Sequence, residues 1–227
     1  MVDFRAARRA MVDGQIRTSD VTDLRLIAAM LDIPREAFVP PSLAALAYAD
    51  RDLPLDSDGD IAVGGRPSRL IARPMVQARL IQAADLEPQD RILVVGAGTG
   101  YSAAVVGRLA ASVTALEQDP QLAARARAVL SEHGLASVSV VEGLLAQGWP
   151  AASPYDVILF DGGVEWIPEG FFGQLASAGR LVAVVIAGMV GKGMLFRSER
   201  GQASGRALFD AMAPMLPGFK KTPTFVF

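Results

Sequence analysis

Three glycines and one carboxylate form the part of this sequence whose residue types and spacing could do chemistry. Gly96, Gly98 and Gly100 stand at alternate positions directly after a run of strand-forming residues, 92–95. Glycine lets the backbone turn sharply and pass close to a ligand, where a Cβ atom would obstruct it. Glu117 follows at the end of a second apolar run, and a carboxylate there can accept hydrogen bonds from both ribose hydroxyls of an adenosine. The pattern therefore predicts a site for a nucleoside cofactor.

The spacing of the glycines favours one cofactor over another. Dinucleotide-binding turns follow G-x-G-x-x-G, and their third glycine lies at a close contact between helix and strand beside the pyrophosphate. Here Tyr101 takes that third position and Gly100 comes one residue early. This register suits S-adenosylmethionine, which has no pyrophosphate, and it disfavours an NAD-dependent oxidoreductase. A tight turn that binds no ligand is the remaining alternative.

Two later turns are expected at the same edge of a parallel sheet, because ligands bind beyond the carboxyl ends of such strands. The first contains Glu142, Gly143 and Leu144 and could border the adenine. Gln118 adjoins the ribose-binding carboxylate and is grouped with the cofactor residues. The second contains Asp161, which is either a substrate contact or general base, or a turn residue that bonds local backbone ahead of two glycines. We favour the turn residue.

The composition restricts the class of protein and its partners. The chain has 227 residues, 51% of them hydrophobic, with 22 basic and 24 acidic residues and a net charge of −2. That balance provides no basic field for nucleic acid and no polybasic patch for a membrane. Without cysteine the chain has no disulfides, thiolate nucleophiles or cysteine metal sites, and no metal is expected. The charged N-terminus does not lead into the apolar segment of a secretory signal, so we expect a cytoplasmic location.

Hydrophobic periodicity predicts a helical N-terminal region followed by alternating strands and helices. Residues 6–31 fit two amphipathic helices that separate near residues 18–20, and residues 74–84 fit a third. Further on, strands are expected at 92–95, 113–116, 138–141, 156–160 and 181–186, and helices at 102–111, 120–133 and 169–176. Continuous apolar strands with helices between them imply a parallel sheet that is covered on both faces.

The C-terminal part does not continue this parallel pattern. Residues 193–198 and 219–227 are β-like without a crossover helix of parallel type between them, so a terminal antiparallel pair is expected. We expect a helical extension and a loop-rich stretch in residues 1–85 and the cofactor-binding core in residues 86–227. The two parts are predicted to form one compact unit.

Beyond the glycine turn and Glu117, the chain resembles the protein-L-isoaspartate O-methyltransferase family over nearly its whole length. The segments that carry the resemblance are MVDGQIR at 11–17, PREAFVP at 34–40, AYAD at 47–50, LPL at 53–55 and SPYDVI at 153–158. The resemblance implies an α/β, Rossmann-like S-adenosylmethionine-dependent methyltransferase fold with a seven-stranded, mostly parallel sheet. It also implies methyl transfer to the free α-carboxylate of an isoaspartyl residue in a protein or peptide, with S-adenosylhomocysteine as the product. The resulting ester collapses to a succinimide, which is the basis of protein repair.

The sequence departs from that family in the segment that holds the methyl acceptor. Counting back from the glycine turn without gaps, the family's G-Q-T-I-S motif falls on residues 68–72. Leu70 and Ala72 replace its threonine and its active-site serine, so two carboxylate-binding hydroxyls are missing and no catalytic residue is assigned. Arg66, Ser68 and Arg69 complete the expected acceptor site. Guanidinium groups there could bind a carboxylate, or they could be solvated charges.

Two functions therefore stay open. The first is an S-adenosylmethionine-dependent carboxyl methyltransferase, of the isoaspartyl type with activity well below that of the family, or with another acceptor. The second is a non-catalytic binding protein that kept the fold and lost the acceptor site. Leu70 and Ala72 favour the second function, whereas the retained glycines and Glu117 indicate that the cofactor is still bound.

Overall fold

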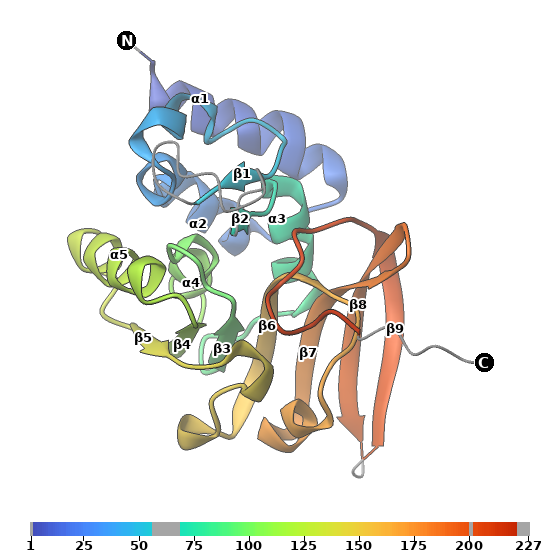
Figure 1. The fold of residues 1–227 in the computed structure, drawn as a ribbon. Coiled ribbons are helices and arrows are strands. Elements are labelled where there is room, and N and C mark those ends of the chain that lie inside the picture. Colours follow the sequence, from blue (N-terminus) through green and yellow to red (C-terminus); the bar gives the residue numbers. More distant parts are fainter. Residues whose placement is uncertain (1, 56–68, 200–201, 222–227) are drawn as a thin grey trace.

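A seven-stranded sheet forms the centre of the molecule (Figure 1). The structure is a computed structural model that describes residues 2–55, 69–199 and 202–221. The strands of the sheet are β3 (Arg91–Val95), β4 (Ser112–Glu117), β5 (Val138–Glu142), β6 (Tyr155–Val164), β7 (Leu175–Ala187), β8 (Val190–Glu199) and β9 (Gln202–Asp210). Their order is β5-β4-β3-β6-β7-β8-β9, with β3 to β7 parallel and β8 and β9 antiparallel. The mostly parallel sheet with a terminal antiparallel pair is confirmed.

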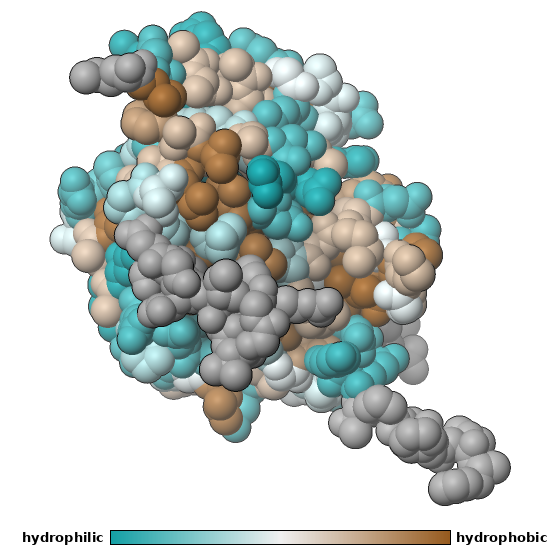
Figure 2. Space-filling model, turned by 45° about the horizontal axis from the view of Figure 1, so that its top comes forward, coloured by the Kyte–Doolittle hydropathy of each residue, from teal (hydrophilic) through white to brown (hydrophobic). Residues whose placement is uncertain are grey.

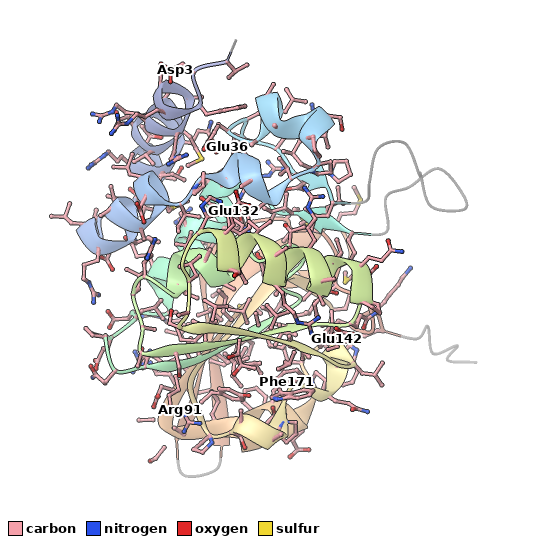
Figure 3. All side chains as sticks on the ribbon, turned by 90° about the vertical axis from the view of Figure 1, so that its left-hand side faces the viewer. Asp3, Glu36, Arg91, Glu132, Glu142 and Phe171 are labelled. Atoms are coloured by element: carbon pink, nitrogen blue, oxygen red, sulfur yellow. The ribbon has the colours of Figure 1, made fainter. Side chains whose placement is uncertain are left out.

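The two faces of the sheet are covered by different kinds of structure. Side chains alternate along a strand, so successive residues of β3 from Ile92 to Val95 enter two separate hydrophobic clusters. Helices cover one face, namely α3 (Pro74–Ala83), α4 (Tyr101–Val106) and α5 (Pro120–Glu132). Short 3-10 turns and the C-terminal segment cover the other face. Figure 3 shows this arrangement, with Glu132 of α5 above the sheet and Phe171 of the 3-10 helix Glu169–Gln174 below it.

Two capped helices begin the chain. Asp3 caps α1 (Phe4–Met11) and Asp23 caps α2 (Leu24–Asp32), each with a side-chain oxygen that accepts from backbone N–H groups of the first turn. Between them a π-helical turn and a 3-10 turn end at Asp20, whose φ of 62° is left-handed. The expected break near residues 18–20 is confirmed, and the second helix begins after its cap at Asp23. On the face that Figure 2 shows, hydrophilic and hydrophobic residues are interspersed.

One hydrophobic core runs through both the N-terminal extension and the sheet. Met30 and Phe38 from the extension belong to the same buried cluster as Val94 of β3 and Val184 of β7. Hydrophobic contacts therefore hold the extension to the sheet. The division of the chain at residue 85 stays a prediction.

Three expected elements differ from the structure. The helix predicted at 102–111 ends at Val106, and Gly107, which has low helix propensity, is its C-cap. A side chain at this cap would collide with Val138, because a Cβ there would lie 2.7 Å from it. The helix predicted at 169–176 is a 3-10 helix, after which β7 begins at Leu175. The antiparallel partner of β8 is β9, which has no β-branched residue to signal a strand. Residues 219–221 belong to no strand, and residues 222–227 lie outside the described part of the chain.

Candidate functional site

β3 ends in a turn whose three glycines adopt left-handed backbone conformations. Gly96, Gly98 and Gly100 have φ angles of 79°, 57° and 96°, a region that residues with a Cβ rarely occupy. The N–H groups of Gly96 and Ala97 both donate to the Leu116 carbonyl, at 2.9 and 3.0 Å, and so fasten the turn to β4. Tyr101 follows directly as the first residue of α4 and is buried. The turn therefore requires its glycines for its own conformation, whether or not a ligand approaches it.

Glu117 ends β4 and is fully buried beside this turn. Its Oε1 atom accepts hydrogen bonds from the backbone N–H groups of Gln118 at 2.9 Å and Asp119 at 3.1 Å. Its Oε2 atom accepts from the N–H of Gly98 at 2.7 Å and from Nη2 of Arg69 at 2.9 Å. The structure thus brings Glu117 to the glycine turn, as the sequence predicts. It also places beside Glu117 an arginine from residues 68–72, which we call the acceptor segment.

Arg69 reaches the glycine turn from a two-stranded sheet. β1 (Leu53–Pro54) pairs with β2 (Leu70–Ile71), and the N–H of Leu55 donates to the Arg69 carbonyl at 3.0 Å. Arg69 is 5% exposed, and its Nη2 atom also donates to the Gly96 carbonyl at 3.0 Å. Its Nε and Nη1 atoms have no hydrogen-bond partner among the described residues. Unpaired buried donors are unfavourable, so they mark a place where an acceptor of hydrogen bonds can be bound.

Two leucines cover the glycine turn. A Cβ atom built on Gly98 would lie 2.7 Å from Leu55, and one built on Gly96 would lie 2.5 Å from Leu216. Leu216 belongs to the C-terminal segment that runs beside the end of β6 (Figure 1), where its N–H donates to the Gly163 carbonyl at 2.8 Å. The chain's own side chains therefore lie directly over the turn in this structure.

Asp161 lies within β6, so its expected place in a turn is wrong. The strand continues to Val164, and the backbone groups of Gly163 pair with the C-terminal segment, which nothing in the sequence indicated. Oδ1 of Asp161 accepts a hydrogen bond from Nε2 of Gln77 at 2.9 Å. The residue retains some exposure, but its carboxyl group is surrounded by protein. That burial raises the pKa of Asp161, and the hydrogen bonds from Gln77 and Ser102 oppose the rise only in part.

Arg35 is a buried arginine that no motif in the sequence indicated as functional, and its hydrogen bonds connect several segments around the site. Arg35 has no exposed surface and donates from Nε to the Ala47 carbonyl at 2.8 Å, from Nη1 to Oε1 of Gln77 at 2.5 Å and from Nη2 to the Ala72 carbonyl at 2.7 Å. Its guanidinium carbon lies 4.6 Å from the centre of the Tyr101 ring. Arg35 therefore joins the extension, α3, the acceptor segment and the first residue of α4. The only signal for it in the sequence is its place in the family-like segment 34–40.

The described part of the acceptor segment carries no hydroxyl group. Leu70 is partly exposed on β2, and Ala72, at the family's serine position, is buried. Arg66 and Ser68 lie outside the described residues. Of the five residues predicted for the acceptor site, the structure therefore places three, and Arg69 is the one that contacts the glycine turn.

The remaining predicted residues lie at the end of β5, next to Glu117. The sheet register pairs Glu117 with Glu142, and the N–H of Gly143 donates to the Glu117 carbonyl at 3.1 Å. Glu142, which Figure 3 labels, is exposed. It accepts a hydrogen bond from Arg127 of α5 at 2.6 Å. Leu144 is exposed. These residues border the site from the side of α5.

Comparison with known proteins decides the family. The family model described as protein-L-isoaspartate(D-aspartate) O-methyltransferase (PCMT) matches residues 6–209. The chain belongs to the PCMT family. The protein-L-isoaspartate O-methyltransferase of Methanoregula boonei is 40% identical over 178 residues, which cover 78% of this chain and 77% of that protein. Its counterpart in Koribacter versatilis is 40% identical over 185 residues, which cover 82% of this chain and 79% of that protein.

Solved structures show the same family fold. A protein-L-isoaspartate O-methyltransferase superposes with a TM-score of 0.78 at 27% identity, covering 93% of this chain and 66% of that chain. A putative PCMT from Plasmodium falciparum, solved in complex with S-adenosyl-L-homocysteine, has a TM-score of 0.74 at 16% identity. The match covers 98% of this chain and 100% of that chain. The Rossmann-like methyltransferase fold that the sequence predicts is confirmed.

As a PCMT, the chain uses S-adenosylmethionine, which confirms the cofactor and the class of enzyme expected from the sequence. The chemistry of the site fits this group, because a carboxylate, a close backbone turn and unpaired guanidinium donors meet at one edge of the sheet. In this structure Arg69 is bonded to the carboxylate, and Leu55 and Leu216 lie against the glycines of the turn. Among the described residues, no group of three or more histidine, aspartate or glutamate side chains could hold a metal ion.

Proposed function

We propose that this chain methylates a free carboxylate on a protein or peptide. The observation that carries the proposal is the meeting of the glycine turn, Glu117 and the acceptor segment at one edge of the sheet, in a chain of the PCMT family. The proposed cofactor residues are Gly96, Gly98, Gly100, Tyr101, Glu117, Gln118, Glu142, Gly143 and Leu144. The proposed acceptor residues are Arg66, Ser68, Arg69, Leu70 and Ala72.

The reaction asks little of the side chains. An ionised carboxylate is already a nucleophile, and the bound cofactor supplies a methyl group on a sulfonium that becomes neutral as it leaves. The chain's task is to hold the acceptor in line and to exclude water. Arg35 serves this task at a distance, because it fixes the carbonyl of Ala72 and the side chain of Gln77, which in turn binds Asp161. Asp161 remains a candidate for a substrate contact or a general base.

We propose that methylation of isoaspartyl peptides is slow, because two hydroxyls are missing from the acceptor segment. Each hydrogen bond left unmade in a closed site costs about 1 to 3 kcal/mol. Restoring both with Leu70→Thr and Ala72→Ser should therefore raise kcat/KM for an isoaspartyl peptide by roughly tenfold or more, since 1.4 kcal/mol is one factor of ten. The control is Leu70→Val, which has the shape of threonine without its hydroxyl. Equal rates for the control and the double variant would show that the residues are not at the acceptor.

Calorimetric titration with S-adenosylhomocysteine tests the proposed cofactor site directly. Saturable binding that Glu117→Gln weakens is the expected result, because the amide replaces one oxygen that the ribose hydroxyls would use. The alternative function is a protein that binds this cofactor without catalysis, and the absence of hydroxyl groups at Leu70 and Ala72 favours it. Binding without transfer to any carboxylate-bearing peptide would establish that alternative, and absence of binding at millimolar ligand would contradict both.

The partners are inferred at a coarser level. Membership of the PCMT family supports a protein substrate, and we propose that the recognised group is a free carboxylate. Among the described residues, no helix has the length and hydrophobicity needed to cross a membrane. A cytoplasmic location and the absence of nucleic-acid partners stay predictions.

A further inference from the structure

We propose that Arg69 binds the carboxylate of the methyl acceptor, and that Glu117 holds the same guanidinium until the cofactor's ribose takes its place. Cofactor and acceptor would then bind in that order. This inference rests on the proposed function, because it assigns a role within the same site.

The first observation is that Arg69 uses the groups that a ribose would use. Nη2 occupies Oε2 of Glu117 at 2.9 Å and the carbonyl of Gly96 at 3.0 Å, while Oε1 is fully engaged by the N–H groups of Gln118 and Asp119. Glu117 has no exposed surface, so a hydroxyl cannot reach Oε2 without displacing the guanidinium. Both ligands of Glu117, the arginine and the ribose, therefore compete for one carboxylate oxygen.

The second observation is that Arg69 uses a single nitrogen atom, Nη2, for its hydrogen bonds to both Glu117 and Gly96. Nε and Nη1 are buried and have no hydrogen-bond partner among residues 2–55, 69–199 and 202–221. A guanidinium has five N–H groups, and its planar fork matches the two oxygens of a carboxylate. Release from Glu117 would free all five groups for an anion, so the arrangement in this structure is not the one that satisfies Arg69 best.

The third observation is the place of Arg69 in the chain. It directly precedes β2, whose Leu70 and the following Ala72 stand where the family has its two carboxylate-binding hydroxyls. The backbone of Arg69 is fixed there by the hydrogen bond from Leu55, while its side chain extends to the glycine turn. A displaced side chain therefore remains within the acceptor segment. An arginine at this point can replace the missing hydroxyls with charge-assisted hydrogen bonds.

The test measures two affinities that should change in opposite directions. Arg69→Met keeps much of the volume of the side chain and removes its charge, so Glu117 is free to bind the ribose. If the guanidinium occupies Glu117 in about nine of ten wild-type molecules, the variant should bind S-adenosylhomocysteine about tenfold more tightly. In the complex saturated with S-adenosylhomocysteine, the same variant should bind an isoaspartyl peptide at least about tenfold more weakly, because a charge-assisted hydrogen-bond pair is lost. The peptide control carries an amide in place of the isoaspartyl α-carboxylate, and neither protein should bind it well.

Arg73→Met is the matched control. Arg73 lies four residues after Arg69, just outside the acceptor segment; it is partly exposed and pairs with Asp52 at 3.5 Å, so its loss should leave both affinities within about twofold. If Arg69→Met weakens the binding of both ligands, Arg69 has only a structural role. If neither affinity changes, the contact with Glu117 does not oppose cofactor binding. Either result overturns the inference. Failure of wild type and variant alike to bind S-adenosylhomocysteine would instead refute the proposed function. Arg69→Gln provides a second, polar variant with the same expected directions.

Discussion

Replacement of Arg35 is the sharpest test of how the extension positions the site. Arg35→Met preserves much of the side-chain volume but removes the guanidinium, leaving three buried acceptors without their donor: the carbonyls of Ala47 and Ala72 and Oε1 of Gln77. The three segments that carry these acceptors come from separate parts of the sequence. The substitution should therefore lower stability and disorder the acceptor segment together.

The expected magnitude follows from two opposing effects. Three unsatisfied buried acceptors cost about 1 to 3 kcal/mol each, or roughly 3 to 9 kcal/mol in sum. Removal of a buried charge recovers part of this, because burial of the guanidinium itself is unfavourable, as the lowered pKa of Arg35 indicates. The net loss expected for breaking such a buried network is about 3 to 5 kcal/mol. At about 2 to 4 °C per kcal/mol for a domain of this size, Tm should fall by roughly 6 to 20 °C.

Urea unfolding and differential scanning calorimetry measure the effect. The control is Arg108→Met, which removes a surface ion pair with Asp32 at 3.0 Å and should cost at most about 1 kcal/mol. Arg35→Lys should resemble Arg35→Met more than wild type, since one ammonium cannot reach three acceptors in the geometry of the guanidinium. A loss for Arg35→Met no larger than that for Arg108→Met would refute the reasoning, because it would mean that the three hydrogen bonds contribute no net stability.

Two further predictions concern stability alone. Asp161→Asn should raise Tm at neutral pH and lose this advantage on acidification. Burial raises the folded-state pKa of Asp161 above its unfolded value, so the contribution of this residue to stability is most favourable at low pH and is lost as pH rises through the folded pKa. Thermal scans across a pH series measure this, and a constant difference at all pH values would contradict it. Gly100→Ala should cost about 1 to 2 kcal/mol or more, since φ is 96° and the new Cβ would lie 3.2 Å from Leu130. Gly14→Ala, with no positive φ and open space around it, is its control in urea unfolding and should be neutral or slightly stabilising.

Local patterns in the sequence were enough to predict most of the fold. The runs that became β3, β6 and β7 are rich in buried apolar residues, and the glycine turn requires left-handed conformations that only glycine adopts readily. β9 was missed because its nine residues include no β-branched side chain, and pairing with β8 makes it a strand. The end of β6 was misread for a similar reason, since it is extended by the C-terminal segment that lies beside it.

The sequence by itself determined the turn, the carboxylate that follows it and the hydroxyls that the acceptor segment lacks, because each of these depends on residue type and short-range spacing. Only the tertiary structure decided what these residues contact. Arg69 and Glu117 are 48 residues apart, and Arg35 and Ala72 are 37 apart, so no local pattern could pair them. Packing of the extension against the sheet fixes both pairs. That packing placed a guanidinium on the carboxylate that the sequence predicted would receive a ribose.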